Sequence, residues 1–199
     1  IMEPTSKSDA SGNRQSDVIC QTQGSGKSLT MVMLAKYILE ELKPLNPRVV
    51  VITDRKELDK AIATTFAHTR LTPARATSGK NLCDLINDGK ADIITSIINK
   101  FNTVDNQGVK NNSRDIFVLV DESHRSNYGS LATKMRTVFP NACYIGFTGT
   151  PLMKNEKNTM AKFGKLIHKY TIKDGVEDKA IVPLIYEGKF VDQNVDEEN

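Results

Sequence analysis

The sequence predicts an α/β protein with a doubly wound, mainly parallel sheet and helices on both faces. Short apolar runs alternate with stretches whose apolar residues recur at helical spacing, a pattern typical of strand–helix–strand units. Several runs are continuously apolar, as strands buried on both faces of a parallel sheet are. A glycine-rich segment, residues 24–28, separates the first run from the first helical stretch. Phosphate-binding loops occupy this position in such sheets.

The first strand is predicted at residues 18–20, and the first helix follows at residues 28–42. Two further helices are predicted where apolar residues recur at helical spacing, at residues 57–66 and 79–87. The other apolar runs predict strands at residues 48–53, 92–96, 116–120, 143–148 and 181–187. Polar composition predicts surface loops at residues 102–114 and 154–158.

One domain is expected, because 199 residues suffice for a single well-buried core. This domain is predicted to span residues 17–190. Residues 1–16 lack hydrophobic periodicity and are predicted to be a flexible tail. Residues 191–199 are acidic, and we expect either an acidic tail or a truncated end there.

The composition is that of an ordinary globular protein, with 39% hydrophobic and 26% charged residues. The net charge of +3 does not by itself indicate a nucleic-acid partner. The apolar runs are shorter than the ~20 residues that span a bilayer, and the polar N-terminal segment is not a secretory signal. Cys20, Cys83 and Cys143 form neither a disulfide nor a zinc pattern. We therefore expect a cytoplasmic protein without a membrane partner.

A phosphate-binding loop is predicted where the first strand leads into the first helix. Glycines let backbone N–H groups curl around phosphate oxygens, and the helix N-terminus favours an anion. Lys27 can reach the β- and γ-phosphates of ATP, and the Ser28 hydroxyl can bind Mg²⁺. The segment departs from the pattern G-x-x-x-x-G-K-[ST] at Gln21, and a turn without a ligand is the alternative. The predicted ATP-binding residues are Thr22, Gln23, Gly24, Ser25, Gly26, Lys27 and Ser28.

Two acids follow the run at residues 116–120 and are predicted to lie at the carboxyl edge of the sheet, where ligands bind. Asp121 is predicted to hold Mg²⁺, and Glu122 is predicted to orient and polarise the attacking water. Adjacent acids can also be mere surface charge, but the phosphate-binding loop favours hydrolysis. We therefore predict Lys27, Asp121 and Glu122 as the catalytic residues.

A third motif, Gly146-Phe147-Thr148-Gly149-Thr150-Pro151, ends the run at residues 143–148. Its hydroxyls can sense the γ-phosphate, although glycine and proline also mark plain turns. We predict that His124, Thr148, Gly149 and Thr150 couple the nucleotide state to movement.

Together with Ile52-Thr53-Asp54-Arg55, which lies between the first two, these three motifs resemble in their order motifs I, Ia, II and III of superfamily 2 helicases. The whole resembles the first motor lobe of the R subunits of type I restriction endonucleases, from about residue 13 to 193. Cys20 and Gln21 depart from that family, which usually has Trp and His there. The segments that carry the resemblance are Thr22-Gln23-Gly24-Ser25-Gly26-Lys27-Ser28-Leu29-Thr30-Met31, Ile52-Thr53-Asp54-Arg55, Asp121-Glu122-Ser123-His124-Arg125, Phe147-Thr148-Gly149-Thr150-Pro151, Phe163-Gly164, His168-Lys169-Tyr170-Thr171-Ile172 and Val182-Pro183-Leu184-Ile185-Tyr186-Glu187-Gly188.

The resemblance implies a RecA-like lobe that uses ATP and Mg²⁺ to move along duplex DNA. It also implies a second motor lobe and a nuclease domain in a longer chain, together with modification and specificity subunits. DNA contacts are expected at Thr53, Arg55, Ser96 and Lys100, because this region touches phosphate oxygens in the family. A capped helix start at Thr53 and Asp54 and a solvated Lys100 form the alternative.

Two other functions stay open: the motor lobe of another superfamily 2 DNA helicase or repair or remodelling ATPase, and a nucleotide-gated DNA-binding module without turnover. A GTPase is disfavoured, since Asn99-Lys100-Phe101-Asn102 lacks the aspartate that reads guanine. Asp121 and Glu122 disfavour a small-molecule kinase, because they suggest activation of water. We expect the isolated chain to be a poor ATPase and no nuclease.

Overall fold

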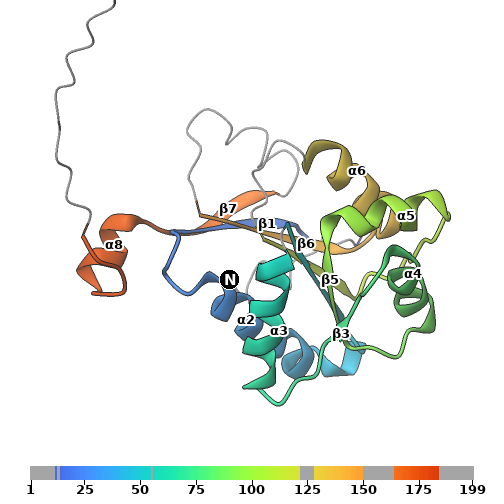
Figure 1. The fold of residues 1–199 in the computed structure, drawn as a ribbon, viewed down its shortest axis with the longest axis horizontal. Coiled ribbons are helices and arrows are strands. Elements are labelled where there is room, and N and C mark those ends of the chain that lie inside the picture. The colour runs from blue at the N-terminus through green and yellow to red at the C-terminus, as the bar shows by residue number, and fades with distance from the viewer. Residues whose placement is uncertain (1–11, 13, 55, 122–127, 150–163, 184–199) are drawn as a thin grey trace, which may run out of the picture.

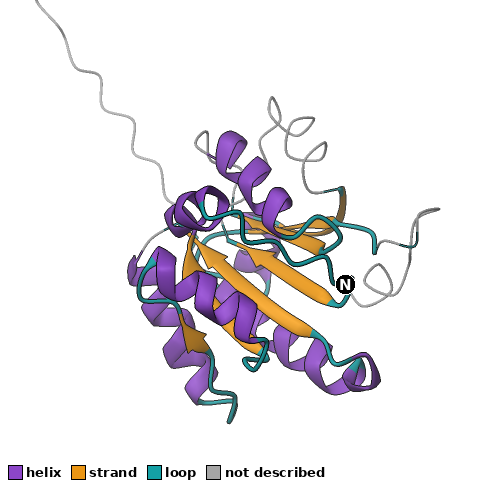
Figure 2. Ribbon diagram, turned by 90° about the vertical axis from the view of Figure 1, so that its right-hand side faces the viewer, coloured by secondary structure: helices purple, strands orange, loops and turns teal. Residues whose placement is uncertain are grey.

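The computed structural model describes residues 12, 14–54, 56–121, 128–149 and 164–183. They form one seven-stranded sheet in the order β3-β4-β2-β5-β6-β1-β7 (Figure 1). Every neighbouring pair of these strands is parallel. Helices flank the sheet on both faces (Figure 2), so the predicted doubly wound α/β architecture is confirmed.

Five of the predicted strands are present, with bounds that differ little from the apolar runs. They are β1 (Asp17–Gln21), β2 (Arg48–Thr53), β4 (Ile93–Ile97), β5 (Ile116–Val120) and β6 (Cys143–Thr148). The sequence did not predict β3 (Ala74–Arg75) or β7 (Lys165–Tyr170). The strand predicted at residues 181–187 is wrong at its start, because residues 181–183 form no strand, and the remainder lies outside the described residues.

The three predicted helices are α2 (Lys27–Glu41), α3 (Lys56–Ala67) and α4 (Gly79–Asp88). The structure adds α5 (Phe101–Asn106), α6 (Tyr128–Val138), α8 (Ile172–Glu177) and the short 3₁₀ helices η1 (Lys43–Leu45) and η2 (Ile98–Lys100). The loop predicted at residues 102–114 is therefore wrong over α5. Phe101 and Val104 are fully buried, and this burial holds α5 against the core despite its polar outer residues.

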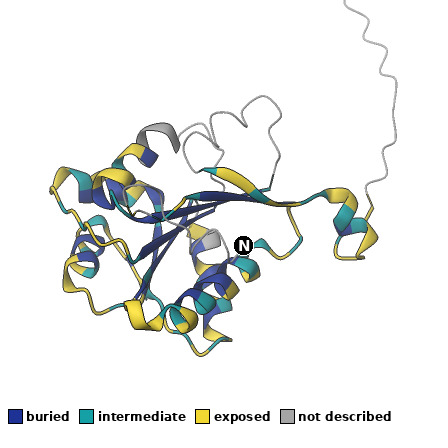
Figure 3. Ribbon diagram, turned by 180° about the vertical axis from the view of Figure 1, so that it is seen from behind, coloured by how far each residue is buried: buried dark blue, intermediate teal, exposed yellow. Residues whose placement is uncertain are grey.

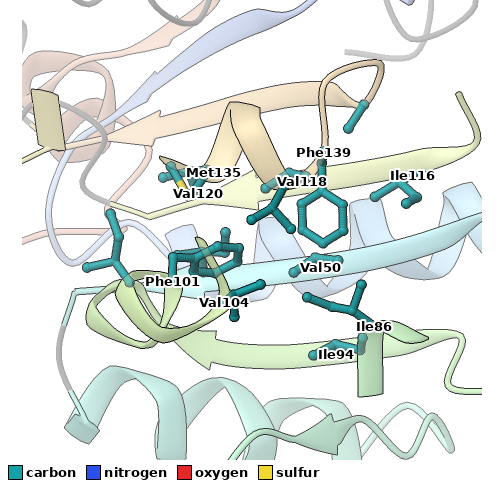
Figure 4. Close-up of a cluster of buried hydrophobic side chains, with 14 of the residues drawn as sticks. Val50, Ile86, Ile94, Phe101, Val104, Ile116, Val118, Val120, Met135 and Phe139 are labelled. Atoms are coloured by element: carbon teal, nitrogen blue, oxygen red, sulfur yellow. The ribbon is translucent and has the colours of Figure 1, made fainter. Parts of the chain in front are cut away.

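The core has two halves, one on each face of the sheet. Successive residues of β2 alternate between them: Val50 and Ile52 face α4, α5 and α6, whereas Val49 and Val51 face α2 and α3. Figure 4 shows the first half, where the side chains of Ile86, Phe101 and Phe139 lie over the strands. Burial on both faces explains why the central strands are continuously apolar (Figure 3).

Strand β7 approaches β1 closely at its first residues. Gly164, directly before β7, has φ of +102°, and a Cβ built on it would lie 1.5 Å from the carbonyl oxygen of Ser16. Only glycine fits this conformation and this spacing. The two strands then pair from Asp17 and Lys165 onward. No helix among the described residues is long and apolar enough to cross a membrane.

Candidate functional site

The carboxyl ends of β1 and β5 bring the predicted phosphate loop and the predicted acid together. These strands lie on either side of β6. The ammonium nitrogen of Lys27 lies 3.0 Å from Oδ1 of Asp121, and the two side chains are 13% and 2% exposed. An ion pair with so little solvent contact is weakly screened. Two residues that are distant in sequence therefore share one site.

The loop between β1 and α2, which the sequence predicts to bind phosphate, has two glycines with positive φ. Gly24 and Gly26 have φ of +84° and +89°, the left-handed region that favours glycine. Helix α2 begins at Lys27 without a side-chain cap, so its first N–H groups remain available to an anion. A Cβ built on Gly26 meets nothing within 4 Å, so the space beside Gly26 is open.

Hydrogen bonds from side chains and from a neighbouring strand hold the loop in place. Gln21 donates from Nε2 to the carbonyl oxygen of Ser25 at 3.0 Å, and Ser25 donates from Oγ to the carbonyl oxygen of Thr22 at 2.6 Å. The N–H of Thr22 donates to the carbonyl oxygen of Tyr170 in β7 at 3.0 Å. The sequence predicted the loop but missed the supporting role of Gln21 and β7.

Ile181, which follows helix α8 and packs against Gly175 of that helix, lies near the same loop. A Cβ built on Gly24 would lie 3.4 Å from Cγ2 of Ile181, an ordinary contact distance. A capping box starts α8: the N–H of Asp174 donates to the Thr171 hydroxyl, and the N–H of Thr171 donates to the Asp174 carboxylate. The Thr171 hydroxyl also donates to that carboxylate, which thus accepts two bonds from Thr171. These bonds lower the pKa of Asp174. In Figure 1, α8 lies beyond β7 and apart from the other helices.

The residues present fit ATP and Mg²⁺. Ser28 is half-buried in the first turn of α2, and the carboxylate of Asp121 stands across from the loop beside Lys27. Hydroxyl and carboxylate oxygens are ligands that Mg²⁺ prefers. Thr148, at the end of β6, is buried between the two motifs. Glu122, His124 and Thr150 lie outside the described residues, so their roles stay predictions.

The residues predicted to contact DNA are mostly buried or already hydrogen-bonded. The side chains of Thr53 and Ser96 are 1% and 0% exposed, so neither presents a surface to a ligand. Lys100 donates from Nζ to the carbonyl oxygen of Ala76, and burial lowers its pKa. Lys100 is therefore neither simply solvated nor free to extend without breaking this bond. Arg55 lies outside the described residues.

A basic pocket of about 270 Å³ includes Lys100 in its lining. The sequence did not predict this pocket. Nε of Arg75 lies 2.5 Å from Oδ2 of Asp59, a carboxylate that is 1% exposed. Asp59, Ile62 and Phe66 share the buried face of α3. An acid on such an apolar face is a sequence signal for a partner cation. The lining residues are Lys56, Asp59, Arg75, Ala76, Thr77, Ile97 and Lys100.

Known proteins with similar sequences are subunits of restriction enzymes. The endonuclease subunit of the type I restriction enzyme HindI from Haemophilus influenzae is 34% identical over 196 residues, covering 88% of this chain and 19% of the relative. A putative type I endonuclease subunit from Methanocaldococcus jannaschii, MjaIXP, is 32% identical over 94% of this chain and 18% of the relative. The chain thus spans about a fifth of the length of these curated relatives.

Solved structures of similar fold are helicase and ATPase cores. The Hef helicase domain of Pyrococcus furiosus superposes with a TM-score of 0.59 at 20% identity, over 78% of this chain and 34% of that one. The SWI2/SNF2 ATPase core of Sulfolobus solfataricus, solved with double-stranded DNA, gives a TM-score of 0.53 at 16% identity, over 73% and 30%. These likenesses confirm the RecA-like fold.

The restriction-enzyme resemblance inferred from the motifs agrees with these relatives, and the ion pair of Lys27 and Asp121 brings together two of the motifs that carry that resemblance. The SWI2/SNF2 ATPase family matches residues 1–199. The chain belongs to the SWI2/SNF2 ATPase family, as a superfamily 2 motor lobe.

Proposed function

We propose that this chain binds and hydrolyses ATP with Mg²⁺ as the first motor lobe of a type I restriction endonuclease subunit, which translocates along duplex DNA. The observation that carries the proposal is the 3.0 Å approach of Lys27 to Asp121 at the open phosphate loop. Relatives named as type I endonuclease subunits support the larger assignment.

Each residue of the site has a proposed task. Residues 22–28 bind the phosphates, with Lys27 on the β- and γ-phosphates. Ser28 and Asp121 hold Mg²⁺, which neutralises charge on the phosphates when bound. Glu122 orients the attacking water. His124, Thr148, Gly149 and Thr150 couple the nucleotide state to movement, since β6 lies between the strands that carry the loop and the acid.

The proposed partners follow from the relatives. The matched segment covers about a fifth of their length, so a second motor lobe and a nuclease domain belong to the proposal, as do modification and specificity subunits. We place the complex in the cytoplasm. The motor lobe of another superfamily 2 helicase is the second candidate, because the Hef helicase domain has the same fold.

Calorimetry with ATP and Mg²⁺ tests the nucleotide assignment, with GTP as the control ligand. We expect ATP to bind and hydrolysis to be slow with or without duplex DNA. The stabilising arginine of such motors comes from the second lobe and contributes ~10³–10⁵ in rate. Failure to bind ATP would overturn the proposed function. Rapid DNA-stimulated phosphate release would instead show that the chain holds a complete site.

The basic pocket is the proposed contact for a DNA phosphate. Arg75 is 42% exposed while the buried Asp59 fixes its Nε, so the rest of its guanidinium can face an anion. Lys56, also on the pocket wall, is exposed at the start of α3, where the helix dipole favours negative charge. Backbone contacts of this kind position DNA without reading its sequence.

Replacing Arg75 by alanine is expected to weaken duplex binding uniformly across sequences and to lower the salt slope of log K by about one. Fluorescence anisotropy at several salt concentrations measures both quantities. Lys90→Ala is the control, because Lys90 is exposed before the amino end of β4, whereas the pocket lies at the carboxyl end of that strand. An equal loss of DNA affinity in the two variants would contradict the assignment of the pocket to DNA binding, without bearing on the proposed ATP site.

A further inference from the structure

Gln21 stands where the phosphate-loop pattern has its first glycine, at the last position of β1. Its side chain is not directed to solvent, since the residue is 9% exposed. The amide nitrogen reaches across the loop and donates to the carbonyl oxygen of Ser25 at 3.0 Å. This bond connects the last residue of β1 to the backbone in the middle of the loop.

The bond has a geometric consequence for the neighbouring peptide. In a trans peptide the C=O of one residue and the N–H of the next point in opposite directions. Holding the Ser25 carbonyl toward Gln21 therefore turns the N–H of Gly26 away from the strand, toward the open space beside Gly26. The Thr22 carbonyl is held in the same way by Oγ and N of Ser25, which directs the N–H of Gln23 away from these donors.

We infer that Gln21 is a positioning residue for the triphosphate: its amide fixes the Ser25 peptide so that the loop N–H groups face the phosphates before ATP arrives. The inference rests on the proposed ATP site. Preorganised donors bind an anion more tightly because no ordering is needed on binding.

The oxygen of the Gln21 amide, Oε1, allows a positioning role to be distinguished from a contribution to stability. Oε1 is buried and has no hydrogen-bond partner among the described residues. A buried acceptor without a partner destabilises a fold, and an apolar side chain of similar shape can be neutral or stabilising there. Gln21→Met removes this unsatisfied oxygen together with the donor, so stability and nucleotide affinity are expected to change independently.

The experiment compares Gln21→Met, Gln21→Glu and Gln21→His by calorimetry with ATP–Mg²⁺ and by thermal unfolding. We expect Gln21→Met to bind ATP about 2- to 12-fold more weakly, the contribution of one neutral hydrogen bond, with an equal or higher Tm. Gln21→Glu should bind more weakly still, because a carboxylate repels the Ser25 carbonyl. Gln21→His should regain affinity, since an imidazole N–H can donate to that carbonyl.

Unchanged ATP affinity in Gln21→Met would overturn the inference, as would a fall in Tm that accounts for the lost binding. If Gln21→Met does not fold, the order of Gln21→His over Gln21→Glu in ATP affinity decides, and equal affinities would overturn it. Lys27→Ala is measured alongside. Loss of binding in Lys27→Ala together with unchanged binding in the Gln21 variants would reject only this inference and retain the ATP site.

Discussion

Replacing Lys27 by alanine is expected to weaken ATP–Mg²⁺ binding by about 100-fold or more. The ammonium is positioned at the phosphate loop, 3.0 Å from Oδ1 of Asp121. Hydrogen bonds to charged groups contribute ~1.5–3 kcal/mol each, and Lys27 is placed to contact two phosphates. Calorimetry on both proteins measures the change, and thermal unfolding shows whether the variant is folded.

Lys36→Ala is the matched control for this substitution. Lys36 lies on the same helix, α2, but forms an exposed pair with Glu40 at 3.6 Å, and such pairs contribute ~0.3–0.5 kcal/mol. We expect its ATP affinity to equal that of the unmodified chain. Lys27→Ala binding as tightly as Lys36→Ala would contradict the phosphate-loop assignment.

Replacing Gly164 by alanine is expected to cost about 3 kcal/mol or more of unfolding free energy. The added Cβ would lie 1.5 Å from the carbonyl oxygen of Ser16 and 2.4 Å from its carbonyl carbon. The contact is backbone to backbone, so no side-chain rotation relieves it. The φ of +102° adds strain for any residue with a Cβ. Urea denaturation measures the loss.

Gly108→Ala separates the two contributions to this effect. Gly108 also has a positive φ, +66°, but a Cβ built on it meets nothing within 4 Å. The conformation alone should cost about 1–2 kcal/mol. A Gly164→Ala loss no larger than that of Gly108→Ala would mean that β7 shifts away from β1 without penalty.

The sequence predicted the central strands well because burial on both faces leaves a continuous apolar run. Strand β7 lacked that signal, since its residues are exposed or half-buried at the edge of the sheet. Strand β3 has only two residues, too few for any periodicity. Helix α5 was mistaken for a loop because two buried side chains, Phe101 and Val104, hold an otherwise polar segment. Strands β3 and β7 and helix α5 therefore depend on edge position and tertiary packing, which a local sequence pattern does not reveal.

The sequence predicts the motifs of the candidate site separately. The strand order shows that they lie close together in space. Residues 22–28 and Asp121 were each identified from local sequence, but their proximity depends on β1 and β5 flanking β6. Local sequence does not predict the basic pocket, because Arg75 belongs to the two-residue strand β3 and its partner Asp59 lies on a distant helix face. Thr53 and Ser96 were proposed as contacts although the sheet buries both.

The contacts of β7 and Ile181 with the predicted phosphate loop impose a thermodynamic linkage. Thr22 is bonded to Tyr170, and Ile181 lies against Gly24. A binding partner that displaces this segment must therefore alter the free energy of nucleotide binding. By reciprocity, the nucleotide alters the affinity for that partner by the same factor. A partner that binds at this edge of the sheet would therefore change the nucleotide affinity of the proposed ATP site.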